Sequence, residues 1–171
     1  MEGHWERGNT LLHEGKLDQA LAEFERVLAL DPRHAPAHNR VGVVHAQRGD
    51  LAQARAWFEK ALDIDPRYAP AHSNLGNVLY TEGRLEEAIQ SYRRAIAIDP
   101  GYALAYHNLA AAYKKAGKIA QAIECLKKSQ SLKRREWDQD LRRDLKRMRG
   151  KLGCALGALV ILAFVVGGLA L

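Results

Sequence analysis

The sequence of 171 residues is poor in the residue types that mark several protein classes. Its two cysteines, Cys125 and Cys154, lie far apart and form neither a metal-binding pattern nor a disulfide framework. Five prolines and 14 glycines are too few for a low-complexity linker protein. The first residues, MEGHWERGN, lack the apolar core of a secretory signal peptide. The composition therefore does not call for an oxidising compartment or for export.

Charged and apolar residues divide the sequence into three zones. Apolar residues make up 47% and charged residues 27%, as in an ordinary folded protein. The whole chain carries a net charge of +6, of which residues 133–151 contribute +5, from nine Lys and Arg against four Asp and Glu. No charged side chain follows Lys151. A near-neutral body, a basic stretch and an apolar end are thus expected to have different roles.

The body repeats with a period of 34 residues. Several independent residue classes keep this spacing: the dipeptides Asp31-Pro32, Asp65-Pro66 and Asp99-Pro100; the series Gly8, Gly42, Gly76 and then Ala110; the series Gly15, Gly49, Gly83 and Gly117; and the series Phe24, Phe58, Tyr92 and Leu126. Chance does not explain one period in so many classes, so the body is predicted to be a repeat architecture.

Each residue class has a physical role in the repeat. Apolar residues fall at helical spacing, which predicts helices over about residues 2–14 and 17–30 in the first unit. A glycine between them permits the left-handed conformation that reverses the chain. The proline after aspartate ends the second helix. The small residues allow the two helices to approach closely, and the aromatic series fills the gap between neighbouring pairs.

A 34-residue helical hairpin with these residues resembles the tetratricopeptide repeat. The resemblance covers residues 1–134 as four units, 1–34, 35–68, 69–102 and 103–134. It implies an all-α, right-handed superhelical solenoid whose first helices line a concave side, where members of the family bind peptides. Stacked units share a core that one unit alone cannot bury. In the fourth unit Arg134 stands where proline is expected, so the last helix should run on.

The resemblance places a set of mostly polar residues on the concave side: Trp5, Asn9, Asn39, Arg40, Ser73, Asn74, Asn77, Tyr80, His107, Asn108 and Lys114. Asparagine both donates and accepts hydrogen bonds, so it suits contact with a peptide backbone. The strings SNLG and HNLA resemble the asparagine ladder of O-GlcNAc-transferase-like proteins, but only half of that ladder is present. Solvated polar positions are the alternative. A clamp for acidic C-terminal peptides is weakly matched, because Trp5 stands where that class has lysine.

Catalytic and metal-binding groupings are not found in the sequence. The pair His34 and His38 has the spacing of helical metal ligands, but Pro36 lies between them and should start the helix there. No nucleophile–base grouping, phosphate-binding loop or paired-carboxylate site stands outside the repeat pattern. The sequence therefore predicts a protein that is not an enzyme and uses neither a cofactor nor a metal.

Residues 135–151 are predicted to form an amphipathic helix. Trp137, Leu141, Leu145, Met148 and Leu152 recur at spacings of four, four, three and four. The stripe would cap the open core of the fourth repeat; a coiled-coil seam between copies and nucleic-acid binding are the alternatives. Nucleic acid is not expected as a partner, since a neighbouring membrane explains the basic residues better. These are Arg142, Arg143, Lys146, Arg147, Arg149 and Lys151.

Residues 152–171, LGCALGALVILAFVVGGLAL, are predicted to be a transmembrane helix that acts as a tail anchor. Twenty residues of helix reach about 30 Å, the thickness of the hydrocarbon core. A buried helix is the alternative. The basic cluster before the span should stay in the cytoplasm, and the repeats with it. Gly153 and Gly157 form a GxxxG pattern that permits a homodimer in the membrane.

Together these features predict a membrane-anchored scaffold that binds a partner protein or peptide on its cytoplasmic concave surface and contacts lipid through its C-terminal helix. Two alternatives remain open. One is an accessory or import- or fission-type membrane adaptor. The other is a non-catalytic relative of the repeat-containing O-GlcNAc-transferase-like proteins.

Overall fold

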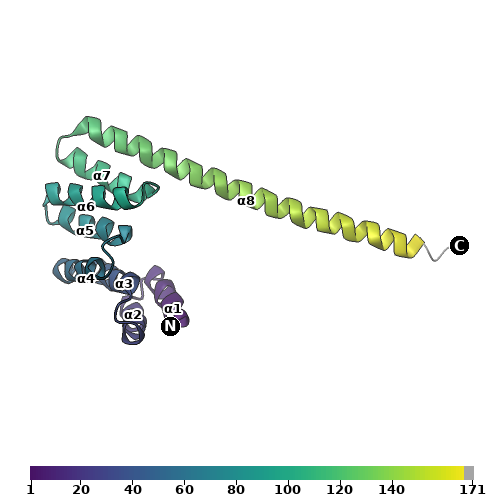
Figure 1. Cartoon of the computed structure of the whole chain (residues 1–171), viewed down its shortest axis with the longest axis horizontal. Helices are drawn as coiled ribbons and strands as arrows, with labels where there is room; N and C mark the ends of the chain where they lie inside the picture. Colours follow the sequence, from purple (N-terminus) through teal and green to yellow (C-terminus); the bar gives the residue numbers. More distant parts are fainter. Residues whose placement is uncertain (168–171) are drawn as a thin grey trace. The chain divides into compact units, whose positions relative to one another are not determined.

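The computed structural model of the chain describes residues 1–148 in full and follows the backbone of the last helix to Gly167. It is all-α in the residues that it describes, and it divides into two units, Met1–Gln130 and Ser131–Leu171. The helices of these residues are labelled in Figure 1, and α8 is the longest of them. They are α1 (Glu2–His13), α2 (Leu17–Leu30), α3 (Ala35–Gln47), α4 (Leu51–Ile64), α5 (Ala69–Thr81), α6 (Leu85–Ile98), α7 (Ala103–Lys115) and α8 (Ile119–Gly167).

The turn inside each hairpin is built on glycine, as the sequence predicts. Gly15, Gly49, Gly83 and Gly117 have φ of +74°, +86°, +80° and +75°. This left-handed conformation costs an L-residue with a side chain about 1–2 kcal/mol, so glycine is the residue that fits. The predicted helices over residues 2–14 and 17–30 correspond to α1 and α2 within one residue.

The turn between hairpins depends on the aspartate of each Asp-Pro dipeptide. Asp31 is extended, with φ −139° and ψ 92°, and it ends α2. Its Oδ1 accepts a hydrogen bond from the backbone N–H of Arg33 at 3.0 Å. Asp65 and Asp99 accept the same bond at 2.9 Å. The aspartate thus holds the turn that the following proline begins.

Histidines in register add a second link to this turn. The Nε2 atoms of His38 and His72 lie 2.9 and 3.0 Å from the carbonyl oxygens of Pro32 and Pro66. His4 precedes every such turn, and its Nδ1 lies 2.6 Å from Oε2 of the buried Glu23 on α2 instead. This hydrogen bond is the main reason that the pKa of Glu23 is lowered.

Close approach of the two helices in a hairpin is permitted by a missing side chain. A Cβ atom added to Gly8, Gly42 or Gly76 would lie 2.6–2.7 Å from a ring carbon of Phe24, Phe58 or Tyr92. These rings are at most 2% exposed. The fourth repeat changes both members of the pair, since Ala110 replaces the glycine and Leu126 replaces the ring. Leu126 is 37% exposed, whereas the rings that it replaces in register are buried.

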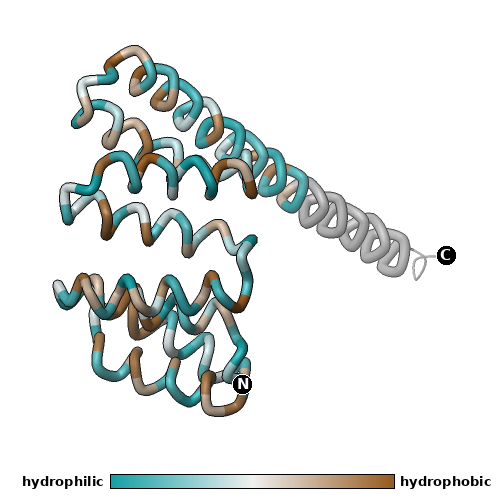
Figure 2. Tube along the Cα trace, turned by 60° about the vertical axis from the view of Figure 1, so that its left-hand side comes forward, coloured by the Kyte–Doolittle hydropathy of each residue, from teal (hydrophilic) through white to brown (hydrophobic). Residues whose placement is uncertain are grey.

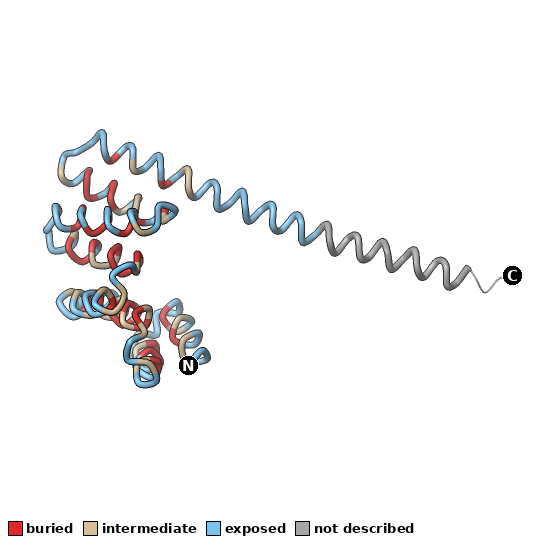
Figure 3. The backbone as a smooth tube through the Cα atoms, in the orientation of Figure 1, coloured by how far each residue is buried: buried red, intermediate tan, exposed pale blue. Residues whose placement is uncertain are grey.

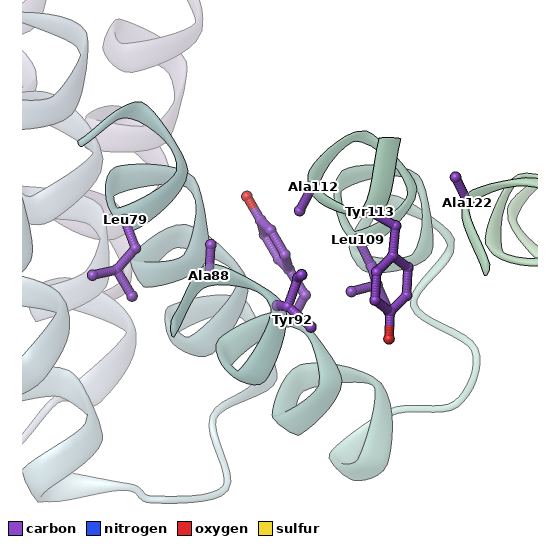
Figure 4. Packing of buried hydrophobic residues seen from close by; sticks show 8 residues of the cluster. Leu79, Ala88, Tyr92, Leu109, Ala112, Tyr113 and Ala122 are labelled. Atoms are coloured by element: carbon purple, nitrogen blue, oxygen red, sulfur yellow. The ribbon is translucent and has the colours of Figure 1, made fainter. Parts of the chain in front are cut away.

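The core of the first unit runs between hairpins as well as inside them. One cluster joins Leu79 of α5, Tyr92 of α6, Leu109 and Tyr113 of α7 and Ala122 of α8, and Figure 4 shows where these side chains lie on their helices. Figure 2 shows hydrophobic positions recurring along each repeat helix, and Figure 3 shows that buried residues recur in the same periodic way. The stack is therefore a solenoid in which each hairpin completes the core of the next.

The last helix does run on, as the absence of proline at Arg134 predicts. α8 begins at Ile119 as the second helix of the fourth hairpin and continues past residue 134. The core at this end is open, because Ile119, Ile123 and Leu126 are 53%, 48% and 37% exposed. α8 is helical throughout residues 119–148, and the stripe side chains Trp137, Leu141, Leu145 and Met148 are exposed. The capping of the fourth repeat by residues 135–151 stays a prediction.

In the part of the chain that the structure describes, no helix combines the length and the apolar character needed to cross a membrane. The predicted span at 152–171 lies outside the described residues, and so do Arg149, Lys151 and the predicted dimer contact at Gly153 and Gly157. These predictions stay predictions.

We expect Gly42→Ala to lower the stability of the solenoid by about 1–3 kcal/mol, because the new methyl overlaps the ring of Phe58. Urea unfolding followed by circular dichroism measures this loss. Phe58→Leu in the same chain copies the Ala110 and Leu126 pair, so the double variant should lose less than the sum of the single losses. Gly3→Ala, where nothing lies within 4 Å of the added methyl, is the matched control. Equal losses for Gly42→Ala and Gly3→Ala would contradict the packing argument.

Candidate functional site

The inner side of the stack is formed by the first helices of the hairpins. α3 contacts α5, and α5 contacts α7. Contacts of that extent are not found between successive second helices α2, α4 and α6, all of which lie within the described residues. A stack whose first helices are closer together than its second helices curves with the first helices inside. The predicted concave side therefore coincides with the faces of α3, α5 and α7.

A hollow of about 260 Å³ lies on this side, between α3 and α5. Its floor is apolar and its rim carries carboxamide and hydroxyl groups. It is lined by Val43, Ala46 and Gln47 of α3, Leu51 and Phe58 of α4, and Asn74, Asn77, Val78 and Thr81 of α5. An apolar side chain suits the floor, and a polypeptide backbone suits the rim.

Hydrogen bonds between carboxamides join successive first helices. The Nδ2 of Asn74 on α5 donates to Oδ1 of Asn39 on α3 at 2.9 Å. The Nδ2 of Asn108 on α7 donates to Oδ1 of Asn77 on α5 at 2.9 Å. Asn74 and Asn108, the predicted half-ladder, are thus engaged in the solenoid itself. Each carboxamide has further donor and acceptor capacity for a ligand, because one bond uses only part of it.

Asn77 is the most connected of these residues. Its Oδ1 also accepts a hydrogen bond from the hydroxyl of Tyr92 at 2.8 Å. Tyr92 is the buried ring that lies against Gly76. The position of Asn77 at the hollow is therefore set by the packing inside the hairpin.

Aromatic and cationic side chains extend the inner side toward both ends of the first unit. The ring of Trp5 packs edge-on against Phe24 at 5.8 Å and against His34 at 5.2 Å, measured between ring centroids. The guanidinium carbon of Arg40 lies 6.0 Å from the centroid of Trp5. At the other end, Nζ of Lys115 lies 4.5 Å from the centroid of Tyr80. Cations near rings in this way gain from the ring quadrupole.

The remaining predicted groove residues differ in how accessible they are. Asn39 and Ser73 are only 2% and 1% exposed, so their side chains belong to the packing and not to an open surface. His107 and Lys114 are exposed on α7. Asn9 is half-buried, and its Nδ2 donates to the carbonyl oxygen of Trp5 at 2.8 Å.

Gln47, Val78, Thr81 and Lys115 were not among the predicted site residues. Gln47 and Thr81 each follow a predicted inner residue by four or seven positions on the same helix, so helical spacing from Arg40 and Asn77 could have found them. Lys115 follows Asn108 by seven positions on α7, so the same spacing includes it, although its contact with Tyr80 depends on how α7 packs beside α5.

A second hollow, of about 520 Å³, lies among α4, α5 and α6, and five of its lining residues are charged: Arg55, Glu59, Arg84, Glu87 and Arg94. At its edge Arg84 donates to Glu87 at 2.6 Å and to Glu82, which lies outside the lining, at 3.2 Å. A ligand would have to separate these paired charges. The hollow on the inner side has an apolar floor and carboxamides at its rim that need no ion pair to be broken. It is therefore the stronger candidate for a binding site.

Among the residues that the structure describes, no group of three or more His, Cys, Asp or Glu side chains lies close enough together to hold a metal ion. The two histidines with ligand spacing have other contacts. Nδ1 of His34 accepts the backbone N–H of Ala37 at 3.1 Å and so caps α3. His38 is bonded to the carbonyl of Pro32.

A curved stack of helical hairpins with a hollowed inner side defines a helical-repeat scaffold. Family models confirm that the helical hairpins are sequence repeats of a known kind. Models described as tetratricopeptide repeat match residues 6–69, 57–90 and 103–136, and one described as TPR repeat matches residues 76–117. The chain therefore contains tetratricopeptide repeats. No curated protein matches it significantly in sequence.

Solved structures with the same fold are similar over most of the first unit. A crystal structure of MamA is 25% identical, with a TM-score of 0.68, and 80% of each chain is covered. PilF of Pseudomonas aeruginosa is 31% identical, with a TM-score of 0.72, over 78% of this chain and 61% of PilF. A mutant O-GlcNAc transferase of Thermobaculum terrenum is 28% identical, with a TM-score of 0.63, over 66% of this chain but only 22% of the transferase.

The buried hydroxyl of Tyr92 predicts a loss of stability at alkaline pH. Burial raises the pKa of this tyrosine in the folded chain, whereas the unfolded chain ionises near 10. A raised folded pKa gives a contribution that is complete below the unfolded pKa and is lost as the pH rises above it. Tyr92→Phe should therefore flatten the fall in urea midpoint above about pH 10. An unchanged pH dependence would show that Tyr92 does not contribute to it.

Proposed function

We propose that the chain is an adaptor that binds an extended segment of a partner protein along the inner side of its repeats and holds it at a membrane. It acts by binding and not by catalysis. The observation that carries the proposal is the hollow between α3 and α5, which joins an apolar floor to a rim of carboxamides. A preformed groove of this kind needs little reordering, and this favours affinity.

The chemistry of the hollow suggests the kind of segment that it binds. The floor at Val43 and Val78 takes one apolar side chain, while Gln47 and Asn74 on the rim bond to backbone amides on either side of it. Arg40 lies one turn before Val43 on the same helix and supplies positive charge next to the hollow.

Membrane attachment is the second part of the proposal. It rests on the apolar run at 152–171 and on the basic residues before it, which favour a cytoplasmic position of the repeats. Arg142, Arg143, Lys146 and Arg147 are exposed on α8, so they are available to anionic headgroups.

A second candidate function is a non-catalytic relative of O-GlcNAc-transferase-like proteins. The observation in its favour is the similarity of the repeats to those of the bacterial transferase, together with the two carboxamide bonds between successive first helices. Such a protein would bind, through its repeats, the kind of protein segment that the repeats of a transferase bind. This candidate would be favoured if a ligand contacted the asparagines of the first helices, Asn74, Asn77 and Asn108, and did not enter the apolar floor of the hollow.

Gln47→Phe should block peptide binding by filling the entrance of the hollow, with a loss of affinity of about tenfold or more. The probe is a displayed library of short random peptides, from which the unmodified chain selects binders whose affinity is then measured by fluorescence anisotropy. Gln90→Phe is the matched control, because Gln90 is also exposed and lines the charged hollow on the other side. Equal binding by both variants would remove the inner hollow from the proposal.

Deletion of residues 152–171 should release the chain from membranes. We expect the full chain to stay in the membrane fraction after alkaline carbonate, and the shortened chain to become soluble while keeping its helical circular dichroism. Protease added from the cytoplasmic side should digest the repeats. Release of the full chain by carbonate would overturn the anchor and leave the peptide-binding part of the proposal intact.

A further inference from the structure

The helices whose faces form the inner side, α3, α5 and α7, contain no aspartate and no glutamate. Apart from histidine, their ionisable basic side chains are Arg40, Lys114 and Lys115, which give these helices a charge of +3. The second helices α2, α4 and α6 contain seven acidic and five basic side chains, a charge of −2. Charge is therefore separated across the solenoid, and the inner side is the positive one.

Arg40 is a cation without an acidic partner. In the described part of the chain it forms no ion pair, whereas Arg26, Arg48 and Arg84 each form one. Its Nε is buried and has no hydrogen-bond partner there, and the same holds for Oγ of Ser73, a residue that is 1% exposed. Buried polar groups are normally hydrogen-bonded, so these two atoms call for a partner that the repeats do not supply.

Tyrosine hydroxyls lie near the same guanidinium. Burial raises the pKa of Tyr68, which precedes α5, and the charge of Arg40 acts against this rise. Burial also raises the pKa of Tyr102, which precedes α7, and there the hydroxyl of Ser73 and the charge of Arg40 oppose it. Both tyrosines are therefore neutral at physiological pH and keep their hydroxyl protons as hydrogen-bond donors.

A cation with neutral donors around it, on a face without acidic side chains, suits a carboxylate. A guanidinium binds a carboxylate through two parallel N–H···O bonds, and hydroxyls donate to the remaining lone pairs. The helix dipole favours lysines in the last turn of α7, but it does not account for Arg40, which lies in the middle of α3.

We propose that the segment bound on the inner side is acidic. One internal Asp or Glu side chain of the segment binds Arg40, with Tyr68 and Tyr102 as further donors. A second acidic side chain lies against Lys114 and Lys115. This inference rests on the proposed function and adds to it the chemical class of the bound segment.

The fold also sets the spacing of the two acidic residues. Lys114 and Lys115 are exposed on α7, and Nζ of Lys115 lies 4.5 Å from the ring centroid of Tyr80 on α5. Helices that pack side by side are about 8–10 Å apart, so α3 and α7, with α5 between them, are about 16–20 Å apart. An extended segment that crosses this distance at about 3.3 Å per residue uses about five or six residues. The apolar side chain that enters the hollow between α3 and α5 falls between the two acidic ones.

Peptide selection by a charge-reversed variant tests the proposal. From a displayed library of random peptides, the unmodified full chain should select binders with Asp or Glu on both sides of an apolar residue. Arg40→Glu should instead select Lys or Arg in place of one of these acidic residues. Arg93→Glu is the matched control, because it makes the same change of charge on the exposed face of α6 and should select the same peptides as the unmodified chain.

Affinities of one selected peptide, measured by fluorescence anisotropy, give a second readout. Lys114→Gln/Lys115→Gln should weaken binding about tenfold, and Lys127→Gln/Lys128→Gln, which neutralises two exposed lysines on α8, should leave it unchanged. This pair keeps the proposal testable if Arg40, which lies beside Trp5, proves necessary for folding. Amidation of the C-terminus of the peptide should not change its affinity, because internal side chains carry the charge.

Three results would overturn the proposal. Selection of the same peptides by Arg40→Glu and by the unmodified chain would show that Arg40 does not select the charge of the segment. If Gln47→Phe still blocked those peptides, the hollow and the proposed function would stand without this inference. A large loss of affinity on amidation would assign the charge to a chain terminus. Failure of the unmodified chain to select any peptide would overturn the proposed function and this inference together.

Discussion

The contact between a glycine and an aromatic ring inside each hairpin is the constraint on which the rest of the first unit depends. It sets the distance between the two helices, because a single added carbon at Gly42 would overlap Phe58. The same ring reaches the neighbouring hairpin and takes part in the shared core. Local packing and the stacking of repeats therefore depend on one pair of residue types, repeated every 34 positions.

The inner surface follows from this constraint through a short chain of contacts. Tyr92 is held against Gly76, and its hydroxyl fixes the carboxamide of Asn77, which in turn accepts a bond from Asn108. A residue at the proposed binding surface is thus oriented by a ring in the core. Such a surface is preorganised, and ligand binding need not order it.

Most of the hairpin architecture could be predicted from the sequence, because it depends on residues close in the chain. The turn glycines, the Asp-Pro stops and the continuation of the last helix past Arg134 are of this kind. Contacts between repeats were harder to predict from the sequence. The bond from Asn74 to Asn39 and the burial of Ser73 depend on how strongly the stack curves, and no local pattern encodes curvature.

The open core at Ile119, Ile123 and Leu126 bears on how such arrays change in length. A fold that closes on itself cannot gain a segment without rebuilding its interior. Here the terminal hairpin presents the same kind of face to solvent that the earlier hairpins present to their successors. Gene duplication that added one more 34-residue unit, with proline restored at position 134, would find a ready surface to stack on.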